Sequence, residues 1–90
     1  MKAAVLRKPM DRFYIEDVET PRPRGSEVLV RVRASGVCHT DLHIWEGHYG
    51  PIRVEERGIR FPLIMGHEIA GEVAEVGDQV EGVSKGEKVV

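Results

Sequence analysis

The sequence lacks three features that would place it in a specialised class: a pair of cysteines, a long apolar run and an excess of one charge. Its single cysteine, Cys38, cannot form a disulfide within the chain, which excludes a disulfide-framed secreted domain. The apolar stretch at residues 3–6 is followed at once by Arg7-Lys8, so it is too short for a signal peptide. No segment approaches the ~20 apolar residues of a membrane-spanning helix. A cytoplasmic location is therefore expected.

The charge of the chain is nearly balanced, with 13 basic and 15 acidic residues and a formal net charge of −2. Because no long basic run is present, neither nucleic acid nor an anionic membrane is expected as a partner. The hydrophobic fraction of 41% and the charged fraction of 31% are typical of a globular chain rather than a disordered one. Ninety residues are enough for one small domain and too few for two.

Ten glycines and five prolines divide the chain into short segments in which apolar and polar residues alternate, the pattern of β-strands. The clearest segment is residues 27–35, where valines at every second position predict a half-buried strand that ends at Gly36. A glycine inside a later segment, Gly71, predicts a bulge, a bend or a close approach of neighbouring backbone. Strands are expected at residues 2–6, 12–19, 27–35, 64–77 and 88–90, and exposed loops at residues 20–27 and 47–62.

A short helix is expected at residues 39–47, with Thr40 as its N-cap, Asp41 in its first turn and Gly47 at its end. Many short strands and a single helix predict a mainly β fold, either a sandwich or a small barrel. The last strand-like segment has no turn after it. The barrel is therefore expected to lack its final strands, and the chain to be a fragment of a longer protein.

Two polar clusters are candidates for chemistry, one at Cys38 and one at His67. Cys38 follows a strand and begins a helix, where backbone amide dipoles favour a thiolate. Thiolate and imidazole are both zinc ligands, and a catalytic zinc needs three protein ligands and an open position. A buried, inert thiol and a thiol nucleophile paired with histidine are the alternatives, although no oxyanion-hole motif accompanies the cysteine. From the residues alone the third ligand stays open: Glu68, His43, His48 or a residue beyond Val90.

The segments "GVCHTDLHIWEGHYG", "PLIMGHEIAGEVAEVG" and "SKGEKVV" together resemble the N-terminal catalytic segment of zinc-dependent medium-chain alcohol dehydrogenases. The long loop at residues 47–62 is similar to that of archaeal members. The resemblance extends over residues 1–90 and implies a partly open antiparallel GroES-like barrel. In the complete enzymes of this family the barrel is joined to a Rossmann domain that binds NAD or NADP.

The resemblance also implies a metal centre. In this family the cysteine and the histidine of the two motifs bind the catalytic zinc, which assigns Cys38 and His67 as ligands. Glu68 corresponds to a carboxylate beside the metal that can approach it during ligand exchange. The zinc acts there as a Lewis acid toward an alcohol, and hydride passes to the nicotinamide.

Further residues inherit roles from the same resemblance. Asp41 corresponds to the carboxylate that orients the zinc-bound histidine. Thr40 corresponds to the hydroxyl that takes the proton of the alcohol, and His43 to the outer member of that relay, reached through the cofactor ribose. His39 lies where the family places a cation or histidine near the cofactor pyrophosphate. Tyr49 is expected to line the substrate pocket.

The sequence departs from the family pattern in what it omits. It has no second cysteine as third zinc ligand, no four-cysteine structural zinc lobe and no G-x-G-x-x-G fingerprint. We therefore expect the 90 residues alone to be inactive. The parent enzyme is expected to be a homo-oligomer, a dimer or tetramer, that acts on a small-molecule alcohol. The alternative is a stand-alone GroES-like module that binds a metal or a partner without catalysis.

Overall fold

The computed structural model describes all 90 residues of the chain. It is composed mainly of strands with one α-helix, which confirms the expected fold class. The chain divides into two compact units, the first made of residues Met1–Glu19 and Val37–Gly66 and the second of residues Thr20–Gly36 and His67–Val90. None of the helices combines the length and the apolar character that a membrane span requires.

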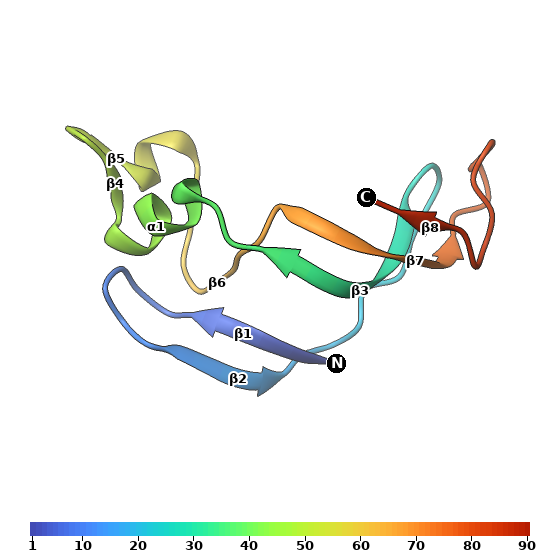
Figure 1. Cartoon of the computed structure of the whole chain (residues 1–90), viewed down its shortest axis with the longest axis horizontal. Coiled ribbons are helices and arrows are strands. Elements are labelled where there is room, and N and C mark those ends of the chain that lie inside the picture. Colours follow the sequence, from blue (N-terminus) through green and yellow to red (C-terminus); the bar gives the residue numbers. More distant parts are fainter. The chain divides into compact units, whose positions relative to one another are not determined.

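The first unit contains a three-stranded antiparallel sheet in the order β2-β1-β6 (Figure 1). Its strands are β1 (Lys2–Leu6), β2 (Phe13–Asp17) and β6 (Leu63–Ile64). Ala3 and Val5 lie on one face of β1 and are buried, as the two-residue period of a strand requires, and Leu6 is fully buried. On β2, Tyr14 lies beneath the guanidinium groups of Arg7 and Arg12, at 4.2 and 4.6 Å from its ring centroid.

The helix of the first unit, α1 (His39–Glu46), begins at the residue that the sequence predicted. Cys38, with extended backbone at φ −115° and ψ 170°, is its N-cap, so the assignment of Thr40 as N-cap was wrong. The reason is the acidic residue three positions after the cysteine, because the Asp41 carboxylate accepts the N–H of Cys38 and fixes that residue at the helix start. Gly47 ends the helix as expected, in the left-handed conformation at φ 94°.

Residues 47–62 are more ordered than the exposed loop that their composition predicted. They form a hairpin of β4 (His48–Tyr49) and β5 (Ile52–Arg53), followed by a 3-10 helix, η1 (Val54–Arg57). Val54 is fully buried, and its N–H donates to the carbonyl of Gly47 at 3.0 Å. Burial of this single valine anchors the segment, while the charged Glu56 and Arg57 stay exposed, as the sequence indicated.

The second unit contains a three-stranded antiparallel sheet in the order β3-β7-β8 (Figure 1). Its strands are β3 (Val28–Gly36), β7 (Glu68–Val76) and β8 (Lys88–Val89). The β3–β7 ladder runs from the pair Val28–Val76 to the pair Gly36–Glu68, with register shifts between Leu29 and Val30 and between Val32 and Ala34. These irregularities interrupt the simple alternation expected for β3, whose residues 31–36 are all exposed.

The two register shifts of the ladder are bulges on opposite strands. The pairing moves from Leu29–Glu75 to Val30–Val73 at the first shift, which leaves Ala74 as the extra residue on β7. At the second shift Arg33 is the extra residue on β3, and its side chain lies 3.4 Å from the carboxylate of Glu72. The second bulge restores the register that the first one changed.

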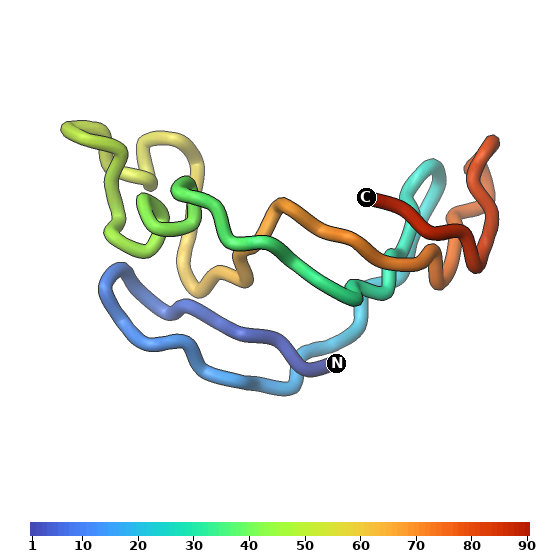
Figure 2. Tube along the Cα trace, in the orientation of Figure 1, coloured from blue at the N-terminus to red at the C-terminus, as the bar shows by residue number.

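Gly71 lies opposite Val32, beside the second bulge, and its position explains why glycine occurs inside this strand. A Cβ atom built on Gly71 would overlap the carbonyl oxygen of Arg31 and lie 2.9 Å from Cγ1 of Val30. The close approach of backbone that the sequence predicted at this glycine is confirmed. Beyond β7 the chain passes through the turns of residues 77–87 to reach β8 (Figure 2).

The strand expected over residues 64–77 is interrupted. Ile64 ends β6 in the first unit, Glu68 begins β7 in the second, and Met65, Gly66 and His67 lie between them outside any strand. Gly66 has a φ of 123°, a region that residues with a Cβ rarely enter. His67 therefore immediately precedes β7 and is not part of the alternating strand in which the sequence placed it.

Candidate metal centre

Cys38 is held in place by a pair of hydrogen bonds with Asp41. The N–H of Cys38 donates to Oδ2 of Asp41 at 3.1 Å, and the N–H of Asp41 donates to the carbonyl of Cys38 at 3.0 Å. Asp41 is only 7% exposed and is the one buried charged residue of the chain. Because both bonds involve the helix start, the cysteine backbone is fixed while its thiol remains half-buried at the N-terminal end of α1.

Glu68 lies at the end of the β3–β7 ladder, opposite Gly36. A Cβ atom on Gly36 would be only 3.3 Å from both the Cβ and Oε1 of Glu68. The Glu68 carboxylate is therefore folded over the Gly36 backbone rather than extended away from β3. Glycine at position 36 provides the space that this side-chain conformation needs.

The pairing of Gly36 with Glu68 in the β3–β7 ladder links the two sequence motifs. Gly36 is two residues before Cys38, and Glu68 is one residue after His67, so connectivity alone keeps both motifs near the same pair of the ladder. Figure 2 follows the backbone from the end of β3 into α1. Cys38, His67 and Glu68 offer a sulfur, a ring nitrogen and a carboxylate oxygen as ligand atoms. This mixed donor set fits zinc, which accepts all three, and is unlike the all-oxygen sets of magnesium or calcium.

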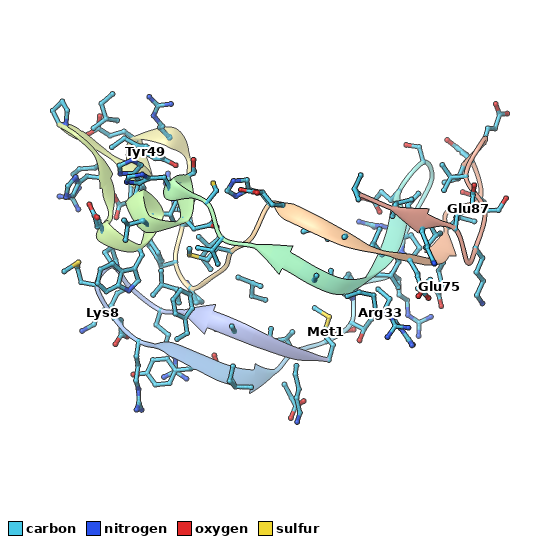
Figure 3. All side chains as sticks on the ribbon, in the orientation of Figure 1. Met1, Lys8, Arg33, Tyr49, Glu75 and Glu87 are labelled. Atoms are coloured by element: carbon cyan, nitrogen blue, oxygen red, sulfur yellow. The ribbon has the colours of Figure 1, made fainter.

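A row of rings lies on α1 and the adjoining hairpin of the first unit. The imidazoles of His39 and His43 are stacked, with centroids 4.7 Å apart and planes inclined by 16°. The ring of His43 also contacts Tyr49, at 5.3 Å between centroids, and the guanidinium of Arg57 lies 5.2 Å from the Tyr49 centroid. Figure 3 shows Tyr49 on β4 close to α1. Thr40 is half-buried on the same helix, one turn before His43.

The structure thus groups some of the site residues that the sequence singled out. His43 contacts both His39 and Tyr49, whereas His48 is exposed on β4. The ring row was not predicted, although the four-residue spacing of His39 and His43 on a helix places two imidazoles on one face. The indole N–H of Trp45 on the same helix donates to the carbonyl of Asp11 at 2.7 Å.

Comparison with known proteins defines the class to which this fold and these motifs belong. Residues 24–90 match the alcohol dehydrogenase GroES-like domain. The chain is 46% identical to the NAD-dependent alcohol dehydrogenase of Sulfurisphaera tokodaii, with 99% of this chain and 25% of that protein covered. It is 48% identical to the D-arabinose 1-dehydrogenase (NADP(+)) of Saccharolobus solfataricus, again over 99% of this chain and over 24% of that protein.

Solved structures of alcohol dehydrogenases are similar to the chain as well. The alcohol dehydrogenase of the archaeon Aeropyrum pernix superimposes with a TM-score of 0.83 at 40% identity, over 98% of this chain and 25% of that one. The chain belongs to the zinc-dependent medium-chain alcohol dehydrogenase family, as its motifs indicated. It spans about a quarter of the length of these relatives.

Proposed function

We propose that this chain is the N-terminal catalytic-domain segment, residues 1–90, of a zinc-dependent, NAD(P)-linked alcohol dehydrogenase that oxidises alcohols to aldehydes or ketones. The observation that supports this most is the pairing of Gly36 with Glu68, which brings the Gly-Val-Cys and Gly-His-Glu motifs to one end of a ladder. Relatives named as dehydrogenases match nearly all of the chain. This favours the dehydrogenase over a stand-alone binding module.

In this proposal Cys38 and His67 are zinc ligands, and Glu68 is a third, exchangeable ligand. When bound, the metal supplies Lewis-acid polarisation of the substrate oxygen. Asp41 contributes by fixing the Cys38 backbone through their two hydrogen bonds and by placing a negative charge next to the site. Exposed Val37 separates Cys38 from Gly36, so the helix start, and not core packing, holds the cysteine.

The proton of the alcohol is handled by residues of α1. The Thr40 hydroxyl accepts it and passes it toward His43, which lies one turn further along the same helix. Histidine suits this step because an imidazole ring can both accept and donate a proton. Tyr49, in contact with His43, would form part of the substrate pocket, and His39 would lie near the pyrophosphate of the cofactor when it is bound. The cofactor itself is bound by a Rossmann domain outside these 90 residues.

The relatives indicate the class of substrate and of coenzyme. One relative is named for NAD and an alcohol and another for NADP(+) and D-arabinose, so we propose a small hydroxylated molecule and either nicotinamide coenzyme. The parent enzyme is proposed to be a cytoplasmic homo-oligomer, a dimer or tetramer. The 90 residues alone are expected to show no NAD(P)-linked alcohol oxidation.

The proposed metal centre is tested by titrating the chain with Co²⁺, a spectroscopic substitute for zinc, beside the Cys38→Ala, His67→Ala and His48→Ala variants. We expect a thiolate-to-metal charge-transfer band in the wild type, loss of the band in Cys38→Ala, and weaker metal binding in His67→Ala. His48→Ala is the matched control and should behave as the wild type. A band unchanged by His67→Ala would show that Cys38 binds the metal without the second motif and would contradict the proposal.

A further inference from the structure

We propose that His39 and His43 form a second transition-metal site on α1, distinct from the zinc ligands Cys38 and His67. The proposal does not depend on the dehydrogenase function, since it rests on the geometry of one helix. Its ligand is a divalent cation that accepts imidazole nitrogen, such as Cu²⁺, Ni²⁺ or Zn²⁺.

The two histidines are neighbours on the surface of the helix. Residues four apart on a helix are neighbours on its surface, and these two rings lie nearly parallel with centroids 4.7 Å apart. In the stacked arrangement the in-plane nitrogens do not point at a common position. Binding one ion at about 2.0–2.1 Å from each ring therefore requires both side chains to rotate out of the stack, without a change in the helix backbone. His39 is exposed and His43 half-buried, so an ion can reach the pair from solvent.

The surroundings of the pair favour a cation. Glu46, an acidic residue, lies three positions after His43 on the same helix and therefore on the same face. The guanidinium of Arg57 lies over the Tyr49 ring.

Occupancy of this site has a consequence for the proposed reaction. An ion bound by His43 uses the ring nitrogen that would otherwise carry a proton, so excess metal should inhibit the parent enzyme. This consequence alone rests on the proposed function. The binding of metal to the two histidines does not.

The experiment is a calorimetric titration with Ni²⁺ and Zn²⁺ in a Cys38→Ala/His67→Ala background, which removes the first site. We expect one remaining site, with binding of Ni²⁺ weakened by at least about tenfold in both His39→Ala and His43→Ala. His48→Ala in the same background is the control and should bind as the background does. Alanine is the best helix former, so α1 is retained in these variants, and far-ultraviolet circular dichroism verifies it.

Two results would overturn the proposal: no binding in the Cys38→Ala/His67→Ala background, or equal affinity in the background and in His39→Ala. Failure of the first metal centre gives a different pattern. In that case Cys38→Ala would leave the total stoichiometry unchanged, while His39→Ala would still reduce it by one.

Discussion

Replacing Asp41 by alanine should destabilise the helix start and weaken metal binding together. The change removes the carboxylate that accepts the N–H of Cys38 at 3.1 Å. A hydrogen bond to a charged group contributes about 1.5–3 kcal/mol, and loss of a helix-capping interaction costs about 0.5–2 kcal/mol. Because Asp41 is only 7% exposed, water cannot replace the bond fully. We expect the free energy of unfolding to fall by about 2 kcal/mol.

The assay has two parts, denaturant unfolding and competition for zinc with a chromophoric chelator. A residue that orients a metal ligand typically changes affinity by about 10–100-fold, and we expect a loss in this range for Asp41→Ala. Asp41→Asn keeps an acceptor oxygen without the charge and should lie between the wild type and Asp41→Ala. Asp17→Ala, at an exposed carboxylate on β2, is the control and should stay within about 0.5 kcal/mol of the wild type.

The role assigned to the Asp41 carboxylate is refuted if Asp41→Ala unfolds at the wild-type denaturant concentration and binds zinc with wild-type affinity. Such a result would mean that the hydrogen bond from the N–H of Cys38 to the Asp41 carboxylate fixes neither the helix start nor the ligand. A loss of stability without loss of zinc affinity would separate the two effects and leave Asp41 a purely structural residue.

Three further substitutions test other parts of the structure. Gly71→Ala places a Cβ against the Arg31 carbonyl, so its unfolding free energy should fall by about 1–3 kcal/mol in denaturant unfolding; an unchanged value would mean that β3 and β7 are not in close contact there. Val54→Ala removes two buried methyl groups and should cost about 1–3 kcal/mol by the same measurement, whereas a neutral effect would contradict the burial of η1. Gly36→Ala should displace the Glu68 carboxylate by a few tenths of an ångström and lower zinc affinity in a competition titration; equal affinity would argue against Glu68 as a ligand.

Local patterns in the sequence were sufficient for most of the elements. The β1 segment was predicted with its observed bounds, and the helix end at Gly47 was recognised because glycine adopts the left-handed conformation there at low cost. Gly71 was correctly linked to a close backbone approach. In each case the cause lies within a few residues of the chain, where sequence reasoning is strongest.

Features that depend on distant residues were not predictable in the same way. The order in residues 47–62 comes from burial of Val54, and one valine among charged residues gives no periodic signal. The bulges of the β3–β7 ladder involve residues about 40 positions apart, and no local pattern marks Arg33 or Ala74 as the extra residue.

The candidate site was predictable in its parts rather than in its arrangement. The motifs at Cys38 and His67 led to the family that the comparisons show. The mistaken N-cap at Thr40 followed from the usual preference for a hydroxyl side chain at that position. In the structure, the helix start is fixed by the hydrogen bond from the N–H of Cys38 to the Asp41 carboxylate.

Because of the two bulges of the β3–β7 ladder, the pairing at the candidate site depends on the number of residues in each strand rather than on the identity of the bulged side chains. Ala74 and Arg33 are extra residues on opposite strands, and their shifts cancel before the ladder reaches the pair Gly36–Glu68. Deleting either residue alone would leave Gly36 one position out of step with Glu68 and turn the following side chains to the other face. Deleting both would bring the two motifs back into alignment. We therefore expect the chain to tolerate the double deletion better than either single deletion, because the two bulges together set the pairing of Gly36 with Glu68.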